Sequence, residues 1–289
     1  MENSRKNAVS VGIMGNIFLF IAKLTIGFIS NSIAIISDAF NSLTDVVNSI
    51  ILFFSVKVGS KSADKDHPFG HHRSEPVGVL IVAVLTIVLG FEIARIAATR
   101  LITKTAPIFS ITIIFILLLT SLIKSFMYLY TRSAWKKTKS TAVFALMIDH
   151  RNDIWISSGA VIGFLGANYN IVFLDALVAF FIGIWIIKVG FSIGARNVKY
   201  LMGESPDPKL LDKISRIALK VNGVRSIQKI KAHYVGTLLQ VEVHIRVSRN
   251  LSLYRAHTIE TNVKKAIEKL RDVDRAFVHV DPIIKSRPH

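Results

Sequence analysis

The chain has 289 residues, 51% of them hydrophobic, and a formal net charge of +17 at pH 7. A hydrophobic share of this size, gathered in long runs, is typical of a membrane protein and argues against an ordinary soluble enzyme. The chain has no cysteine, which excludes a disulfide framework and a thiolate metal site. We find no nucleophile–base arrangement and no phosphate loop, so the sequence does not predict an enzyme or a catalytic cofactor.

Six apolar runs are long enough to cross a bilayer, which takes about 20 residues. The runs are Val9–Ser30, Ser32–Val56, Val77–Ala98, Ile108–Tyr130, Thr141–Leu165 and Ile171–Ile193. The first run is too long for the apolar core of a typical signal peptide, so we expect a retained helix. The sequence therefore predicts an α-helical membrane domain of six transmembrane helices over residues 1–203.

Basic residues gather at the amino end and in alternate connectors. They are Arg5 and Lys6, then Lys57, Lys61, Lys65 and Arg73 in the second connector, and Arg132, Lys136, Lys137 and Lys139 in the fourth. The positive-inside rule therefore places both termini in the cytoplasm, as expected for a protein of the inner cell membrane. Orientation in the bilayer and contact with anionic lipids explain most of the net charge, so we expect no nucleic-acid partner.

The composition changes after Gly203. Asp207 followed by Pro208 is a helix-start signal, and an apolar stripe of helical period comes next. Two segments, "SIQKIKAHYVG" and "TLLQVEVHIRV", alternate as strands do, "SLYRAHTIETNVKKAIEKL" predicts a second amphipathic helix, and "RAFVHVDP" predicts a final strand. The order α-β-β-α-β predicts a cytoplasmic α+β domain of ferredoxin-like type over residues 204–289.

Two acidic pairs lie inside the predicted spans. Asn41 and Asp45 in the second span, and Asp149 and Asp153 in the fifth, are each four residues apart and so share a helix face. Ionisable groups at membrane depth are costly and are functional candidates by default. Four oxygen-bearing side chains on two facing helices could enclose a divalent cation.

A structural role for these acids is the alternative. They could pair with membrane lysines such as Lys23 or Lys124, or cap helix ends. Two pairs of equal spacing in separate spans favour the cation site over this alternative. Asp38, which shares the face of Asn41, fits a structural role.

Two further groups have metal-ligand character. In the second connector, Asp64, His67 and His71 are spaced three and four residues apart, although His72 beside His71 makes the choice of ligand ambiguous. In the tail, the candidate ligands are His244 on a strand, His257 in the following helix, and His279 and Asp281 on one face of the last strand. Exposed polar faces without metal are the alternative for both groups.

The combination of six spans, two acidic pairs, "HPFGHHRSE" after the second span and a C-terminal "HVDP" resembles the cation diffusion facilitator family of divalent-metal/proton antiporters over nearly the whole chain. The resemblance implies a transport site formed by Asn41, Asp45, Asp149 and Asp153. It implies a second metal site at Asp64, His67 and His71. It also implies a metallochaperone-like cytoplasmic domain that dimerises and binds metal through His244, His257, His279 and Asp281.

The departures from the family pattern are informative. Zinc-transporting members commonly place His where this chain has Asp149, and the set here is similar to that of the family's bacterial manganese exporters. Carboxylate and amide oxygens suit manganese, whereas imidazole raises the relative affinity for zinc. A one-residue slip would instead bring His150 into the site. In the cytoplasmic domain, Gln228 replaces a histidine of many members, and His233 is a possible substitute.

From these features we expect a homodimeric exporter of divalent metal, with Mn²⁺ favoured, that exchanges metal for protons by alternating access. Proton coupling follows because metal binding requires ionised carboxylates, so loading releases protons. Two alternatives stay open. One is a Zn²⁺ or Fe²⁺ exporter of the same mechanism, and the other is a non-transporting scaffold that senses metal through its tail.

Overall fold

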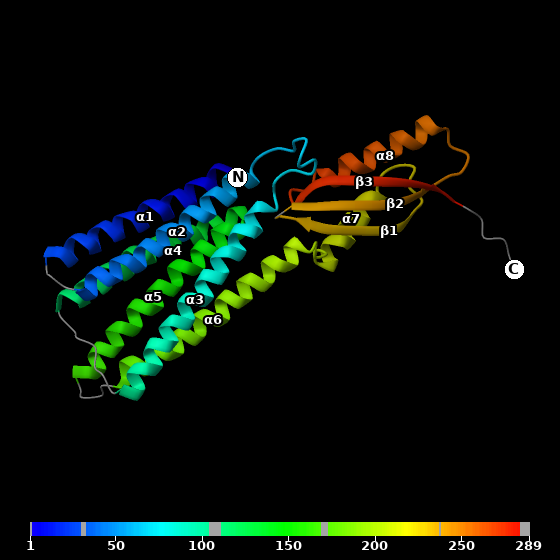
Figure 1. Ribbon diagram of the computed structural model, residues 1–289. Coiled ribbons are helices and arrows are strands. Elements are labelled where there is room, and N and C mark those ends of the chain that lie inside the picture. Colours follow the sequence, from blue (N-terminus) through cyan, green and yellow to red (C-terminus); the bar gives the residue numbers. More distant parts are fainter. Residues whose placement is uncertain (1, 30–32, 104–110, 169–172, 237, 284–289) are drawn as a thin grey trace. The chain divides into compact units, whose positions relative to one another are not determined.

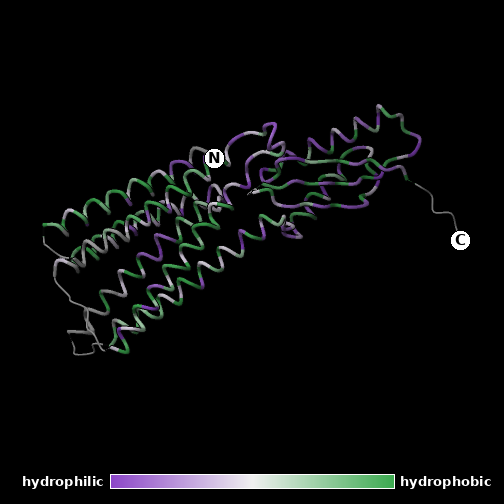
Figure 2. Tube along the Cα trace, in the orientation of Figure 1, coloured by the Kyte–Doolittle hydropathy of each residue, from purple (hydrophilic) through white to green (hydrophobic). Residues whose placement is uncertain are grey.

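The computed structural model describes residues 2–29, 33–103, 111–168, 173–236 and 238–283 (Figure 1). The chain divides into two compact units, Met1–Val198 and Lys199–His289. Hydrophobic residues predominate along the long helices of the first unit, whereas hydrophilic and hydrophobic residues are interspersed in the second unit (Figure 2). The predicted boundary between residues 203 and 204 stays a prediction.

Six long helices form the first unit. They are α1 (Glu2–Ile29), α2 (Ile33–Gly59), α3 (Ser74–Thr103), α4 (Ile111–Thr138), α5 (Thr141–Asn168) and α6 (Phe173–Leu201). Each helix coincides with one predicted apolar run, and several are longer than their run. Helix α3 begins at Ser74 rather than Val77, and α4 ends at Thr138 rather than Tyr130. The predicted first residues of the fourth and sixth runs, Ile108 and Ile171, lie outside the described residues.

In the described part of the chain, five helices are long and apolar enough to cross a membrane, namely α1, α2, α3, α4 and α6. The fifth helix, α5, departs from this composition because Asp149, Arg151 and Asp153 interrupt its middle. It packs against α4, α3, α2 and α1 within the same unit. The sixth membrane-crossing segment, predicted at α5, stays a prediction.

Small residues let α3 approach α6 closely. A Cβ added at Gly90 would lie 2.9 Å from the Gly183 carbonyl oxygen, and one added at Gly183 would lie 2.8 Å from the Ala94 nitrogen. Glycine at helix crossings permits backbone contact of this kind in membrane bundles. A larger residue at either glycine would separate the two helices.

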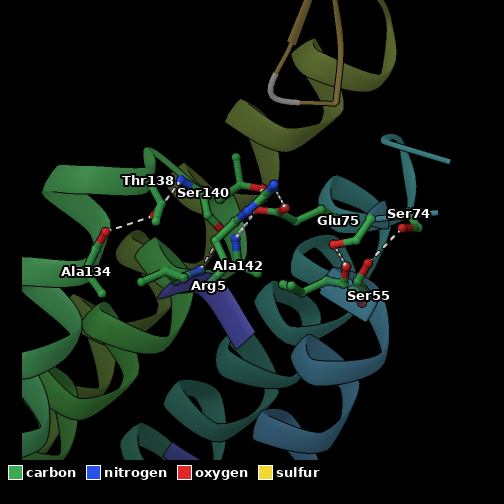
Figure 3. A network of polar contacts seen from close by, with 12 residues as sticks. Arg5, Ser55, Ser74, Glu75, Ala134, Thr138, Ser140 and Ala142 are labelled. Atoms are coloured by element: carbon green, nitrogen blue, oxygen red, sulfur yellow. Dashed lines mark hydrogen bonds and ion pairs between the residues drawn. The ribbon is translucent and has the colours of Figure 1, made fainter. Parts of the chain in front are cut away.

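A buried carboxylate fixes the amino-terminal end of α5 (Figure 3). Glu75, in the first turn of α3, accepts hydrogen bonds from the Ala142 nitrogen at 3.1 Å, the Thr141 hydroxyl at 3.3 Å and the Ser140 hydroxyl. Its other oxygen accepts from Arg5 Nη1 of α1 at 3.3 Å. A negative charge satisfies the free N–H groups at a helix start and suits the helix dipole. Glu75 therefore ties together α1, α3 and α5.

The second unit confirms the predicted order of elements. It contains α7 (Pro208–Leu219), β1 (Ser226–Val235), β2 (Leu238–Val247), α8 (Leu253–Glu268) and β3 (Val273–Pro282). The sheet order is β1-β2-β3, with β1 antiparallel and β3 parallel to β2. The Asp207 side chain caps α7 by accepting from the Lys209 nitrogen, with Pro208 in the first turn, as the sequence signal predicts.

The core of the second unit lies between the two helices and one face of the sheet. Strand β2 alternates as predicted, with Val241, Val243 and Ile245 buried and Glu242 and Arg246 exposed. Gln240 breaks the pattern: only 6% of it is exposed although it lies on the polar face by parity. The two amphipathic helices bury their apolar stripes, including Ile214 of α7 and Ile267 of α8, which completes a self-contained core.

Candidate metal centre

Two of the predicted transport-site carboxylates meet at a buried lysine. Lys124, in the middle of α4, is only 1% exposed. Its Nζ lies 2.8 Å from Asp45 Oδ2 of α2 and also forms an ion pair with Asp153 Oδ2 of α5. One ammonium group thus bridges two helices, and the pairing with Lys124 that the sequence left open is present for Asp45 and Asp153.

Asp149 and His150 complete the buried group on α5. One ligand atom each from Asp149, His150 and Asp153 lie within 4.8 Å of one another. Among the described residues, Asp149 Oδ2 has no hydrogen-bond partner, and neither has either ring nitrogen of the fully buried His150. Asp149 also interacts electrostatically with Lys124. Buried polar atoms without partners are costly, so this part of α5 has more polar atoms than the described residues satisfy.

Asn41 lies on α2, one helical turn before Asp45, as predicted. The side chains of Asn41 and Asp38 lie outside the described part of the structure, so the role predicted for Asn41 as a ligand stays a prediction. Lys23 of α1 is a second buried lysine, 5% exposed, and interacts electrostatically with Asp153.

Contacts between α1 and α2 hold Asp45 in place. The buried Asn16 of α1 donates through Nδ2 to the Asp45 carbonyl oxygen at 3.2 Å and to the Ser49 hydroxyl at 3.0 Å. Both acceptors lie on α2, one turn apart. This amide therefore fixes the register of α1 against the part of α2 that carries the carboxylate.

The connector between α2 and α3 brings its three predicted ligands together. Asp64 Oδ1 lies 3.3 Å from His67 Nδ1, and Oδ2 lies 3.2 Å from His71 Nε2. The turn that allows this places Gly70 at φ 81°, a conformation that suits glycine. A hydrogen bond from the His67 backbone and the charge of His71 lower the pKa of Asp64 below its ordinary value. Asp64 and His67 are more than half exposed, unlike the membrane group.

Three of the four predicted tail ligands also meet. His244 of β2 is the register partner of His279 of β3, and their rings lie 4.9 Å apart. Asp281 Oδ1 lies 3.2 Å from His279 Nε2, and its Oδ2 lies 3.7 Å from His244 Nδ1. His244 also bonds Glu242 Oε1 at 2.7 Å, and this hydrogen bond lowers the pKa of the Glu242 carboxyl group.

Two other histidines of the tail lie apart from this group. His257 of α8 is 71% exposed and pairs with Glu260 of its own helix at 3.2 Å. Gln228 is exposed where β1 is irregular, between Ile227 and Lys229. His233 of β1 is the register partner of Gln240. Among the described residues, neither His257 nor His233 joins the His244–His279–Asp281 group, and Gln228 is next in sequence to Lys229, the register partner of His244.

A unit of long apolar helices with a buried carboxylate group, linked to an α+β unit with its own His/Asp group, is the arrangement expected of a membrane protein that binds a cation. The cation efflux transmembrane domain matches residues 9–202, and the cytoplasmic domain of cation efflux proteins matches residues 206–283. The chain therefore belongs to the cation efflux family of metal transporters, and the resemblance stated from the sequence is confirmed.

The chain is similar to several named proteins over different shares of its length. The uncharacterized transporter MJ0449 of Methanocaldococcus jannaschii is 35% identical over 271 residues, which cover 94% of this chain and 96% of that protein. The manganese efflux system proteins MneS and MneP of Bacillus subtilis are 26% and 27% identical, each covering at least 94% of both chains. A solved MamM-CTD structure is 26% identical and covers 26% of this chain and 96% of its own, with a TM-score of 0.26.

The structure gives Lys124 and Glu75 larger roles than the sequence predicts. Lys124 was considered only as a partner for stray acids, although a lysine inside the apolar run "IFILLLTSLIKSFMYLY" is itself a costly intramembrane charge. The motif "HPFGHHRSE" ends at Glu75, and the sequence predicts no role for this residue. The signal that could have found it is an acidic residue at the very start of a long apolar helix.

Proposed function

We propose that this protein exports Mn²⁺ from the cytoplasm in exchange for protons, and that Asn41, Asp45, Asp149 and Asp153 form the site that carries the ion. The observation that supports this most is the convergence of carboxylates from α2 and α5 on one buried cationic group, the ammonium of Lys124. Two relatives that match nearly the whole chain are named manganese efflux proteins.

The donor set favours a hard cation. Asp45, Asp149 and Asp153 supply charged oxygens, and Asn41 would add a neutral one. Oxygen ligands suit Mn²⁺, which takes six of them with water completing the shell, whereas zinc prefers a tetrahedral shell containing nitrogen. Alternating exposure of one fixed site would carry the ion across the membrane.

Proton exchange follows from the charges of the site. Three carboxylates close together in a membrane helix bundle repel one another when none carries a proton or a cation. Metal binding requires them ionised, so loading expels protons and protonation promotes release. An inward proton gradient would therefore drive metal outward.

A zinc exporter is the second candidate, and His150 is the observation that favours it. Its ring is fully buried beside Asp149 and Asp153, and its nitrogens have no partner among the described residues. A small rotation of α5 would let it supply the nitrogen ligand that zinc prefers. The Asp149 carboxylate would then contribute less to ion binding.

The cytoplasmic domain would join two copies of the chain and sense metal. Its match to the cytoplasmic domain of cation efflux proteins supports a homodimer. Basic connectors and the positive-inside rule support cytoplasmic termini in a cell membrane. The group at His244, His279 and Asp281 would report cytoplasmic metal to the transport domain, and the Asp64 group would bind metal near the cytoplasmic mouth.

Transport in sealed vesicles tests the proposal. Purified protein is reconstituted into proteoliposomes, and Mn²⁺, Zn²⁺ and Fe²⁺ uptake is measured with and without a pH gradient of either sign. We expect Mn²⁺ uptake that a proton gradient accelerates and Asp153→Asn abolishes. A scaffold would move no metal, and a zinc exporter would move Zn²⁺ faster than Mn²⁺ at equal concentration.

A further inference from the structure

The buried lysine of α4 is the most unusual charge in the membrane unit. Lys124 is 1% exposed and lies in a run of apolar residues, where an ammonium group costs a few kcal/mol even on lenient insertion scales. Its Nζ donates a hydrogen bond to Asp45, forms an ion pair with Asp153 and interacts electrostatically with Asp149. The ammonium therefore lies among the carboxylates expected to bind the transported ion.

The ammonium group and the carboxylates lower the free-energy cost of burying one another. Without a nearby cation, the carboxylates of α2 and α5 would repel one another at membrane depth; without the carboxylates, the ammonium would be buried and unpaired, which is strongly unfavourable. A lysine has a compact charge on a flexible four-carbon stem. It can thus fill a cation position and withdraw from it without any movement of the backbone.

We propose that Lys124 is a tethered counter-ion that fills the metal position between Asp45 and Asp153 in the empty transporter and leaves it when a divalent ion binds. This rests on the proposed transport site. Lys124 would be a specificity-determining residue and not a ligand, because an ammonium group has no lone pair to offer a metal.

Charge selectivity is the first consequence. A tethered group acts at a high effective concentration, so a free monovalent cation that offers the same single charge cannot displace it. A divalent cation doubles the attraction to the same oxygens and can. Lys124 would thereby exclude Na⁺ and K⁺, which are far more abundant than any transition metal.

Weakened metal affinity is the second consequence. Every binding event must first break the contacts of Lys124 with Asp45 and Asp153, so the apparent affinity falls by the free energy of those contacts. When the ion leaves, the ammonium returns and prevents rebinding. An exporter benefits from this because tight binding slows release.

Binding to purified full-length protein in detergent tests the inference. Mn²⁺ affinity is measured from the electron paramagnetic resonance signal of free Mn²⁺, with and without 100 mM Na⁺ (about physiological ionic strength). Lys124→Gln removes the charge and keeps a hydrogen-bonding side chain. We expect it to bind Mn²⁺ at least about tenfold tighter than wild type and to lose affinity when Na⁺ is added, whereas wild type is insensitive to Na⁺. Lys188→Gln, at an exposed lysine of α6, should match wild type.

Tighter Mn²⁺ binding by Lys124→Gln cannot result from structural damage. Unchanged or weaker Mn²⁺ binding by a folded Lys124→Gln protein would overturn the inference. If this variant does not fold, Lys124→Arg decides. Its guanidinium keeps the charge and can bind carboxylates through two parallel bonds, so we expect Mn²⁺ binding several-fold weaker than wild type. Equal or tighter binding by Lys124→Arg would also overturn the inference.

The proposed transport site and this inference can fail separately. If wild type binds no Mn²⁺, or if Asp153→Asn binds it as well as wild type does, the transport site is wrong. If wild type binds Mn²⁺, Asp153→Asn does not, and Lys124→Gln is no tighter, then the site stands and only the role of Lys124 is wrong.

Discussion

Helix α5 has carboxylate contacts at two places, and they are built in opposite ways. At its start, the buried Glu75 of α3 accepts from Ser140, Thr141 and Ala142 and pairs with Arg5, so both of its oxygens are satisfied. Two to three turns further on, Asp149 keeps an oxygen without a hydrogen-bond partner among the described residues.

We interpret the difference as one between a structural acid, Glu75, and a proposed metal ligand, Asp149. A carboxylate with all its bonds made within the protein holds elements together and has nothing left to offer a ligand. A carboxylate that lacks partners, beside two others that share one lysine, is a cost to the fold that a bound cation would remove. Sites of this kind trade stability for function.

The exposed groups form a third case. The Asp64 group of the connector and the His244 group of the sheet bring metal-type ligands together, but water can satisfy them when no metal is bound. They therefore cost the fold little when empty, and metal binding there would adjust activity and not carry the ion. Four predictions test these distinctions, starting with the largest effect.

Loss of a membrane carboxylate should abolish transport without harming the fold. We expect Asp149→Asn and Asp153→Asn each to lower Mn²⁺ transport in proteoliposomes at least about 100-fold, which corresponds to about 2.7 kcal/mol of lost ion binding. Asp149→Asn should also raise the thermal denaturation midpoint, because it removes a charge that neighbouring carboxylates repel. Glu92→Gln, a partly exposed position of α3 that pairs with Arg95, is the control and should transport as wild type does.

Loss of Glu75 should have the opposite signature. Glu75→Ala removes hydrogen bonds to a charged acceptor and a helix-start partner for α5, so we expect about 3 kcal/mol less free energy of unfolding in mixed detergent micelles. Remaining folded protein should still bind Mn²⁺ with nearly wild-type affinity. A stable variant that fails to bind Mn²⁺ would show that Glu75 belongs to the transport machinery.

The isolated cytoplasmic domain, residues 204–289, should fold and respond to metal. It has its own core, and a ligand at 100 times its Kd stabilises the folded state by about 2.7 kcal/mol. We expect Mn²⁺ or Zn²⁺ to raise its melting temperature and His279→Ala to remove the increase, while His257→Ala retains it. No increase for the unchanged domain at millimolar metal would mean that the Gln228 departure has disabled the site.

Replacement of one membrane oxygen by nitrogen should change the preferred metal. Asp149→His trades a hard carboxylate for an imidazole, so the ratio of Zn²⁺ to Mn²⁺ transport should rise about ten- to thirtyfold, which corresponds to about 1.4 to 2 kcal/mol. His150→Ala is the matched control and should leave the ratio unchanged. If His150→Ala lowers zinc transport instead, the nitrogen of His150 already serves the site.

Much of the fold was predictable because its signals are local. Long apolar runs and alternating strands come from neighbouring residues, and all six long helices and the order of the tail elements agree with them. The ends of the helices were not predictable, because hydrophobicity marks the apolar run and not the helical turns beyond it. Helix α3, for example, begins at Ser74, within the connector motif. Among the groups of side chains, too, those set by local spacing were predictable and those set by packing between elements were not.

Spacing along one segment predicted that Asp64, His67 and His71 would meet, and strand parity predicted the pair His279 and Asp281. The contact of Lys124 with Asp45 and Asp153 could not be read from spacing, since it depends on how three helices are rotated about one another. The exclusion of His257 has a similar cause. Its position on α8 is set by packing of the helix on the sheet.

Crystals of the full-length protein grown with Mn²⁺ and measured at the manganese absorption edge would test the transport site most directly. We predict an anomalous peak among the carboxylate oxygens of Asp45, Asp149 and Asp153, at metal–oxygen distances, with Lys124 Nζ withdrawn from Asp45 and Asp153. An anomalous peak only at the Asp64 or His244 groups, with Lys124 still paired to both carboxylates, would contradict the assignment of these acids to transport.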